Sequence, residues 1–306
     1  MKTVIIGAGG FLGQRLSKLV AEGSRAGDKL ILIDAVPTTA PGGSARVASI
    51  QVDFTNPQAL AALEGATEVY LLASILGGAA ESNYALARRV NVDASLDLIE
   101  FLRDRVPGAR LVFASTIAVF AKPMPDLVTD QTPTAPVMVY GAQKLMLEVA
   151  ISNFVARGWL DGVSLRLSGV MARDGADARL RTAFMSRVFY AIMRGEDIAL
   201  PVHPTSKTWF TSVDTAARNF LHAGRLAADA MGSDRAFTLP ALHLSFEELV
   251  QALFRRFPDS RSKVTYAPDD ELVSLFGSYP PLETAIADRL GFRRDKDADT
   301  FVAGSF

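Results

Sequence analysis

Four glycines near the N-terminus constrain the fold of this chain more than any other feature. They stand at positions 7, 9, 10 and 13, between an apolar strand pattern at Thr3–Ile6 and a helical pattern from Phe11 to Ala21. Glycine permits a tight turn, close approach of the backbone to a pyrophosphate, and close packing of the helix on the strand, while the helix N-terminus presents unpaired N–H groups to phosphate. The turn therefore predicts a dinucleotide site; the alternative is a purely structural glycine turn.

The first half of the chain alternates short strands with helical patterns. Several strands are apolar on both faces, which is typical of a parallel sheet covered by helices on both sides. The pattern predicts a doubly wound α/β (Rossmann) fold with strands at 3–6, 29–34, 47–52, 68–73, 110–114 and 162–167, and helices that include 11–21, 81–103 and 140–156.

The alternation weakens after about residue 170. We expect a returning strand at 235–239, and helices over 180–194, 213–228 and 245–257, the last opened by a Ser-x-x-Glu capping box. We therefore expect a dinucleotide-binding domain of residues 1–170 with 213–240. Residues 171–212 with 241–306 would form a smaller, discontinuous substrate-binding region over the carboxyl edge of the sheet.

Composition excludes several kinds of site. The sequence has no cysteine, which excludes disulfides, thiolate zinc sites and a cysteine nucleophile. The histidines lack metal-ligand spacing, so we expect no metal. The net charge is −1 and the lysines and arginines are scattered along the sequence, so we expect no nucleic-acid partner. No signal peptide is visible, and no run reaches the roughly 18 apolar residues of a membrane span. We expect a cytoplasmic protein with no membrane partner.

Two acidic residues follow the second and third strands. Asp34 lies about 20 residues beyond the last glycine, where a carboxylate binds the ribose hydroxyls of the adenosine and repels a 2′-phosphate. This position favours NAD over NADP, against the alternative of an ordinary turn residue. Asp53 would accept a hydrogen bond from the adenine amino group, or would cap the next helix in competition with Asn56.

Tyr140 and Lys144 lie four residues apart, on one face of a predicted helix. A lysine ammonium near a phenol lowers the phenol pKa from about 10, which allows tyrosine to act as a general base at neutral pH. Ser115 and Thr116 end the fifth strand, at the sheet edge where ligands bind in this architecture. Together these residues predict an enzyme with a hydroxyl donor, a phenol base and a supporting lysine.

These motifs, over essentially the whole chain, resemble the extended short-chain dehydrogenase/reductases, the NAD-dependent epimerase/dehydratase family. The resemblance implies that Tyr140 is the acid/base, that Lys144 binds the nicotinamide ribose and tunes Tyr140, and that a hydroxyl polarises the substrate oxygen. Counting back from Val119 places that hydroxyl on Thr116, with Ser115 kept open. The resemblance implies these cofactor-binding residues: Gly7, Gly10, Phe11, Leu12, Gly13, Asp34, Asp53, Phe54, Leu72, Ala73, Ser74, Asn91, Tyr140 and Lys144.

Within the family the chain most resembles members that oxidise four-carbon sugar acids such as D-erythronate. A sugar acid carries a carboxylate, which needs cationic or N–H partners. The expected substrate-binding residues are Ser74, Thr116, Tyr140 and Arg173. The neighbouring Asp174 replaces a proline of that group and changes the charge and stiffness of the predicted substrate loop.

The expected function is therefore NAD-dependent oxidation of a hydroxyl on a small sugar acid. A nucleotide-sugar epimerase or dehydratase with tightly bound NAD is the alternative, and a non-catalytic NAD sensor is a third hypothesis, disfavoured because it needs no tyrosine–lysine pair. The family also implies a homodimer formed through the helices expected at 81–103 and 140–156, although the apolar faces of these helices would equally suit core packing.

Overall fold

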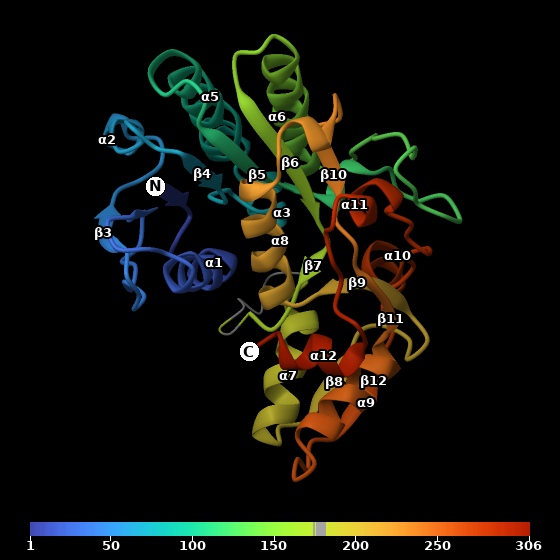
Figure 1. Cartoon of the computed structure of the whole chain (residues 1–306). Coiled ribbons are helices and arrows are strands. Elements are labelled where there is room, and N and C mark those ends of the chain that lie inside the picture. The colour runs from blue at the N-terminus through green and yellow to red at the C-terminus, as the bar shows by residue number, and fades with distance from the viewer. Residues whose placement is uncertain (174, 176–181) are drawn as a thin grey trace. The chain divides into compact units, whose positions relative to one another are not determined.

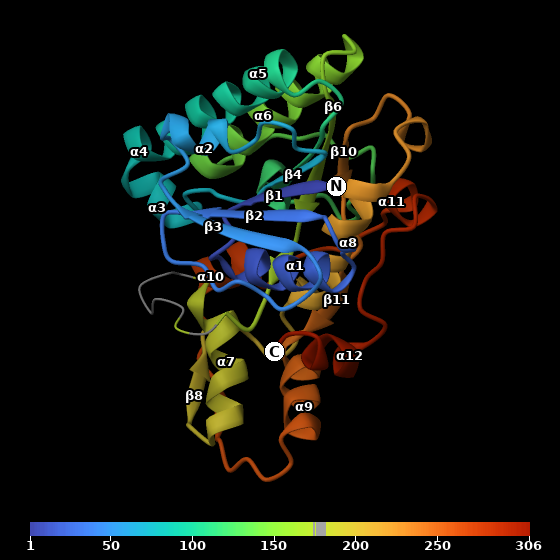
Figure 2. The ribbon, with the colours of Figure 1, turned by 60° about the vertical axis from the view of Figure 1, so that its left-hand side comes forward.

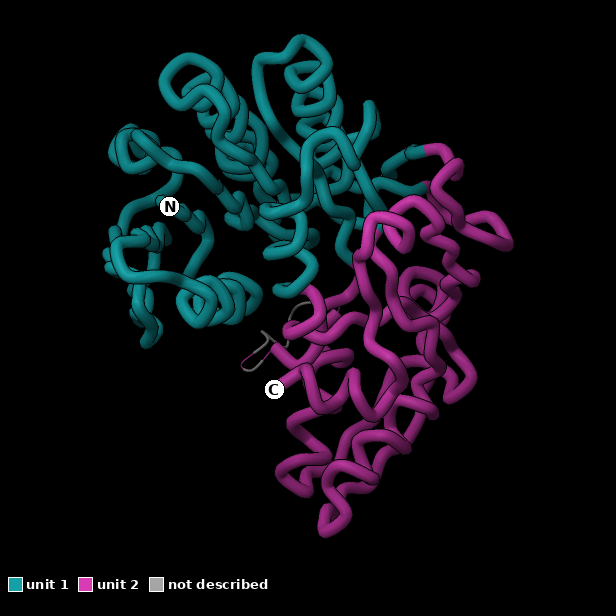
Figure 3. The backbone as a smooth tube through the Cα atoms, viewed as in Figure 1, with its two compact units in different colours: residues 1–120, 134–167, 217–238 teal, residues 121–133, 168–216, 239–306 magenta. Residues whose placement is uncertain are grey.

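The computed structural model describes residues 1–173, 175 and 182–306. The chain divides into two compact units, coloured separately in Figure 3. Unit 1 comprises residues 1–120, 134–167 and 217–238, and unit 2 comprises residues 121–133, 168–216 and 239–306. The segment 121–133, which we had expected within the first domain, belongs to unit 2, where Val128 N donates to Pro281 O at 3.1 Å.

A seven-stranded parallel sheet forms the centre of unit 1 (Figure 1). Its order is β3-β2-β1-β4-β5-β6-β10, so the chain runs outward from β1 in both directions and reverses between β1 and β4. The fold is therefore the predicted doubly wound α/β fold. The strands are β1 (Lys2–Ile6), β2 (Lys29–Asp34), β3 (Arg46–Gln51), β4 (Glu68–Leu71), β5 (Arg110–Thr116), β6 (Asp161–Leu167) and β10 (Ala236–Thr238).

Helices cover both faces of this sheet. Figure 2 shows α5 and α6 on one face and α1 on the other. The helices of unit 1 are α1 (Phe11–Glu22), α2 (Pro57–Ala61), α3 (Gly77–Ser82), α4 (Tyr84–Arg88), the π-helical η1 (Arg89–Asp93), α5 (Ala94–Arg105), the 3-10 turn η2 (Ile117–Val119), α6 (Val139–Ala156), residues 217–225 of α8 (Val213–Arg225) and η3 (Asp229–Met231).

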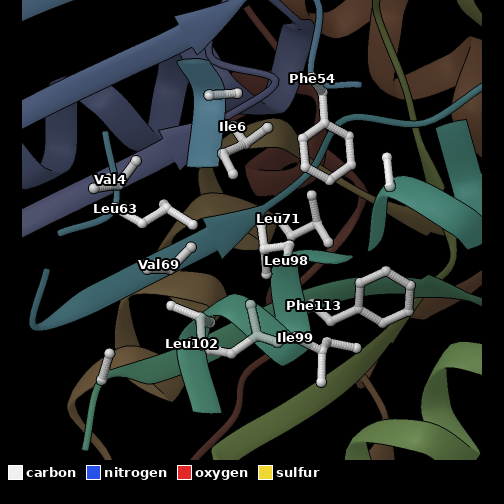
Figure 4. Close-up of a cluster of buried hydrophobic side chains, with 14 of the residues drawn as sticks. Val4, Ile6, Phe54, Leu63, Val69, Leu71, Leu98, Ile99, Leu102 and Phe113 are labelled. Atoms are coloured by element: carbon white, nitrogen blue, oxygen red, sulfur yellow. The ribbon is translucent and has the colours of Figure 1, made fainter. Parts of the chain in front are cut away.

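A continuous apolar cluster fixes α5 and α6 on the sheet. Val4, Ile6 and Leu71 from the strands meet Leu98 and Leu102 of α5, all buried (Figure 4). The same cluster includes Leu147 and Ile151 of α6. Burial of such side chains contributes about 1.5–3 kcal/mol each and holds α5 and α6 against the sheet.

The helix expected over 81–103 is not continuous, so that prediction was wrong. Asn83 has φ −139° and ψ 77°, ends α3, and accepts a hydrogen bond from Leu86 N at 3.1 Å, so it caps α4. Asparagine favours such caps because its short amide competes with the helical backbone. The chain then makes the π-helical turn η1 before α5. Asn91, in the middle of η1, is buried.

Unit 2 has two small sheets and its own aromatic core. The sheets are β11-β9-β7 and β12-β8. Its core contains Phe189, Phe210, Phe246 and Phe301, all fully buried. The helix expected over 180–194 begins at Ala183, with 180 and 181 outside the described residues. The elements are β7 (Gly169–Val170), α7 (Ala183–Arg194), β8 (Ile198–Leu200), β9 (Lys207–Thr211), the first turn of α8, β11 (Leu242–Ser245), α9 (Phe246–Arg256), β12 (Val264–Tyr266), α10 (Asp270–Phe276), α11 (Ala285–Arg289) and α12 (Ala298–Ala303).

Candidate active site

The glycine turn follows β1 and leads directly into α1. Gly7 has φ +91°, and a Cβ there would lie 2.6 Å from Ala73 N. A Cβ on Gly13 would lie 2.1 Å from Gly7 O, so these two positions accept only glycine without movement of the backbone. Gly10 is the N-cap of α1 and has no side chain to occupy the first N–H groups of the helix, at Phe11 and Leu12. The turn is thus a cradle whose N–H donors and positive helix end suit a pyrophosphate.

Asp34 lies against this turn, at the end of β2. Its Oδ2 accepts from Gly9 N at 2.8 Å and its Oδ1 from Val36 N at 3.1 Å. A Cβ on Gly9 would lie 2.8 Å from Val36 Cγ2 and 3.2 Å from the Asp34 carboxyl, so a larger residue there would displace these side chains. Each carboxylate oxygen keeps a further lone pair for a hydroxyl donor.

Asp53 shapes the loop after β3. Its Oδ1 accepts from the backbone N–H and the hydroxyl of Thr55, at 2.8 and 2.7 Å, and these bonds hold the pKa of Asp53 below its usual value. Asn56 caps α2 by accepting from Gln58 N. Phe54, between the two, is buried in the core of unit 1.

Asn91 links the end of β4 to α6. Its Oδ1 accepts from Ile75 N at 2.8 Å and from the Ser74 hydroxyl at 3.1 Å, and its Nδ2 donates to Ile75 O and to Gln143 Oε1. Because the Ile75 backbone fixes which Asn91 atom donates, the Gln143 oxygen must be the acceptor. Gln143 Nε2 is then a buried donor with no partner among the described residues, one position before Lys144.

Ser115 and Thr116 have different surroundings at the end of β5. The hydroxyl of Ser115, a residue that is 2% exposed, donates a hydrogen bond to Glu148 Oε1. Thr116 Oγ1 accepts from Ala118 N at 3.1 Å and caps η2. Successive strand residues point to opposite faces, so the two hydroxyls do not serve the same position.

Lys144 and Tyr140 are brought together on α6. Lys144 Nζ donates to Ala114 O at 2.7 Å, lies 4.5 Å from the centroid of the Phe113 ring, and lies 5.7 Å from the centroid of the Tyr140 ring. Burial lowers the pKa of Lys144 to about 7, and the negative charge of Glu148 acts in the opposite direction. The ammonium is thus held between the strand end and the phenol.

Three residues at this site escaped prediction as functional positions. A Cβ on Gly141 would lie 2.1 Å from Ala118 O, so the residue after Tyr140 must be glycine for α6 to approach η2. Glu148, which is buried, and Arg166, which is partly buried, form an ion pair beside Ser115. The sequence offered two signals for these positions: a small residue directly after Tyr140 and an acidic residue one helical turn after Lys144.

Arg173 belongs to unit 2 and is exposed. It lines a cavity of about 230 Å³ with Arg187, Tyr190 and Arg194. The departure at Asp174 lies outside the described residues. Trp209 is fully buried in unit 2, where its Nε1 donates to Pro280 O at 2.7 Å, so it is a core residue.

The residues of unit 1 fit a dinucleotide. The glycine cradle suits the pyrophosphate, Asp34 offers acceptors for ribose hydroxyls, and the Lys144 ammonium lies near the end of β5, on the same edge of the sheet. Across residues 1–173, 175 and 182–306, no cluster of three His, Asp or Glu side chains is placed to hold a metal ion. Over the same residues, no helix has the length and apolar character needed to cross a membrane.

Known proteins resemble the whole chain. The D-erythronate dehydrogenase of Haemophilus influenzae is 30% identical over 99% of this chain and 98% of its own length. The D-erythronate dehydrogenase of Cupriavidus necator is 31% identical over 99% of this chain and 97% of its own length.

Solved structures share the fold. The nucleoside-diphosphate-sugar epimerase from Agrobacterium tumefaciens has a TM-score of 0.88 and 28% identity, covering 99% of this chain and 92% of its own. The GalE-like L-threonine dehydrogenase from Cupriavidus necator has a TM-score of 0.85 and 23% identity, over 99% of this chain and 98% of its own. The model of the NAD dependent epimerase/dehydratase family matches residues 3–231. The chain is therefore an enzyme of the NAD dependent epimerase/dehydratase family, with NAD as its cofactor.

Proposed function

We propose that this enzyme oxidises a hydroxyl group of a small sugar acid similar to D-erythronate, with NAD as the oxidant. Two relatives named D-erythronate dehydrogenase match nearly the whole length of this chain. The observation that carries the chemistry is the Lys144 ammonium, buried 5.7 Å from the Tyr140 ring centroid and fixed to Ala114 O. A cation so placed stabilises a phenolate, and a phenolate is a base strong enough to take a hydroxyl proton.

The groups then have the following tasks. Bound NAD supplies the hydride acceptor. Tyr140 takes the proton from the substrate hydroxyl as the carbon–hydrogen bond breaks. Lys144 stabilises the Tyr140 phenolate and holds the nicotinamide ribose. Thr116 donates a hydrogen bond to the reacting oxygen, which positions it against Tyr140.

Thr116 is a better candidate than Ser115 for the polarising hydroxyl. The single O–H donor of Ser115 is already hydrogen-bonded to the buried Glu148, so it is not available to a substrate oxygen. Thr116 accepts from Ala118 N, and that bond uses a lone pair and leaves the O–H as a donor. A hydroxyl that must donate to a substrate oxygen needs this second arrangement.

The substrate carboxylate requires a cation or a group of N–H donors. Arg173 offers a guanidinium fork, which binds carboxylates through two parallel hydrogen bonds. Ser74, held by Asn91 after β4, is a second contact. We assign NAD binding to unit 1.

Assembly as a homodimer is part of this proposal. α6 carries apolar residues around its whole circumference, and Met146 and Val149 are 55% and 63% exposed. An apolar helix face of this kind is stable in water when a second copy of the helix covers it. We also propose that the enzyme acts in the cytoplasm.

The reaction is tested by incubating the enzyme with four- to six-carbon aldonic and uronic acids and following NADH formation, with NADP in parallel. We expect turnover of a four-carbon acid with NAD. Tyr140→Phe should lose turnover by a factor of 10² or more, about the contribution of a general base, and should bind NAD as before. Undiminished turnover in this variant would contradict the role of Tyr140, and a strong preference for NADP would contradict that of Asp34.

The similarity to a nucleoside-diphosphate-sugar epimerase supplies a second candidate function. An epimerase of this kind returns the hydride to its substrate, so NAD stays bound and NADH does not accumulate. Protein that is purified with NAD and isomerises nucleoside-diphosphate sugars without net NADH would favour this candidate over the dehydrogenase.

A further inference from the structure

A buried polar cluster joins α6 to β5 and β6. Glu148 of α6 is 2% exposed. Its carboxylate accepts hydrogen bonds from the Ser115 hydroxyl and from Arg166, the latter at 2.7 Å from Nη2 and 3.1 Å from Nε. Ser115 and Arg166 are directly paired in the register of β5 with β6. One carboxylate therefore binds two neighbouring strands from the helix that covers them.

The cluster adjoins every residue to which we assigned a catalytic role. Ser115 immediately precedes Thr116. Glu148 lies one helical turn beyond Lys144 and two beyond Tyr140, on the same face of α6. The Arg166 guanidinium also lies 5.5 Å from the centroid of the Phe120 ring, in the segment that follows η2.

Stability alone does not explain such a cluster. Desolvation of a buried carboxylate–guanidinium pair offsets most of its attraction, and apolar residues of the same volume are often equally stable. What a buried pair with several directed hydrogen bonds supplies is a fixed geometry. In this enzyme the cluster fixes the position of the helix that carries Tyr140 and Lys144 relative to the strand end that carries Thr116.

We propose that Glu148 is the positioning residue of the catalytic site: through Ser115 and Arg166 it sets the place of α6 on the strand end, and one helical turn from Lys144 it places a carboxylate on the same face of α6. The inference rests on the proposed function, because it takes Thr116, Tyr140 and Lys144 as the reacting groups. It assigns Ser115 to the support of Glu148.

The electrostatic part follows from the surroundings of Lys144. Tyr140 and Glu148 face it from α6, and the Phe113 ring and Ala114 carbonyl face it from β5. Burial favours the neutral amine, and Glu148 opposes burial. Removal of the Glu148 charge should therefore lower the pKa of Lys144 further and reduce the ammonium fraction at neutral pH.

A second ion pair in the same sheet provides the control. Arg110 Nε donates to Asp161 Oδ2 at 2.7 Å and bridges β5 and β6 at their opposite, N-terminal ends. Arg110 is also largely buried. Asp161→Asn thus disrupts an ion pair between the same two strands, at the edge far from the reacting groups.

The experiment compares the wild type, Glu148→Gln, Ser115→Ala and Asp161→Asn as full-length proteins. The Lys144 side chain is titrated by NMR in protein labelled with ¹³C-lysine, its signal being assigned by its loss in Lys144→Met. NAD affinity is measured by calorimetry. The constants kcat and KM are measured with the sugar acid that the NADH-formation screen identifies as substrate.

We expect the Lys144 midpoint to fall by about 0.5 pH unit or more in Glu148→Gln and to stay in place in Ser115→Ala and Asp161→Asn. We expect kcat to fall roughly tenfold or more in both Glu148→Gln and Ser115→Ala, since small displacements of reacting groups have effects of this size, and to stay within about twofold in Asp161→Asn.

An unchanged Lys144 midpoint in Glu148→Gln would overturn the electrostatic part. Equal losses of kcat in Ser115→Ala and Asp161→Asn would overturn the positioning part and leave a structural role. The titration needs no substrate, so it decides the electrostatic part even if the sugar acid is not the substrate. If Glu148→Gln does not fold, Ser115→Ala, which keeps every charge, still tests the positioning.

Discussion

Lys144 is the residue in which structure and chemistry conflict most directly. Its ammonium is needed beside Tyr140, yet burial lowers its pKa to about 7, so near neutral pH the two protonation states are similarly populated. In the unfolded chain the same lysine has a pKa near 10.4. The folded protein therefore binds this proton less tightly than the unfolded chain does.

This difference predicts a pH-dependent stability. Between the two pKa values the unfolded state binds more protons, so the free energy of unfolding should rise with pH from about 7 to about 10. Below pH 7 the lysine is charged in both states, and its burial destabilises the folded protein by the full amount. Lys144→Met, which removes the group, should be more stable than the wild type by at least about 1 kcal/mol at pH 7, with a difference that shrinks toward pH 10. Urea unfolding at several pH values measures this, and a difference independent of pH would contradict it.

At the scale of elements, the approach of α6 to η2 depends on Gly141. A Cβ there would meet Ala118 O at 2.1 Å and the Pro136 Cβ at 3.1 Å, and Ala118 O belongs to the backbone, which cannot rotate away. The helix that carries Tyr140 would have to move outward from the strand end that carries Thr116.

Gly141→Ala should therefore lower the free energy of unfolding by roughly 1–3 kcal/mol and kcat by roughly 10², even though alanine favours helix. The matched control is Gly78→Ala in α3, where a Cβ has nothing within 4 Å and should stabilise by up to about 1 kcal/mol. Denaturant unfolding and steady-state kinetics on both variants check this. Equal behaviour of the two would show that the close contact does not position α6.

At the scale of the whole molecule, the exposed apolar face of α6 predicts a second copy of the chain as its cover. Val149→Glu places a charge on that face, at a side chain that is 63% exposed and outside the core of unit 1. We expect a dimer in the wild type and a monomer in Val149→Glu, by light scattering after size exclusion, with the far-UV spectrum unchanged. A wild type that is monomeric at micromolar concentration would contradict the proposal.

Local sequence determined the features that depend on neighbours along the chain. The fold and the cofactor were predicted from the glycine spacing, the acid at the end of β2, the Tyr140–Lys144 spacing and the apolar strands. These features are readable because turn geometry, helical periodicity and strand burial are set within a few residues. Fold class and NAD were accordingly confirmed. The site residues themselves stay predictions.

Only the tertiary structure decided which polar side chains meet. It placed Ser115 against Glu148, 33 residues away, and Asn91 against Gln143, 52 residues away. Such contacts depend on how α6 packs on the sheet, and hydrogen bonds between distant segments leave no periodic signal in the sequence. The difference between Ser115 and Thr116 has the same origin, because adjacent residues of a strand face opposite sides and only the packed helix shows which side is which.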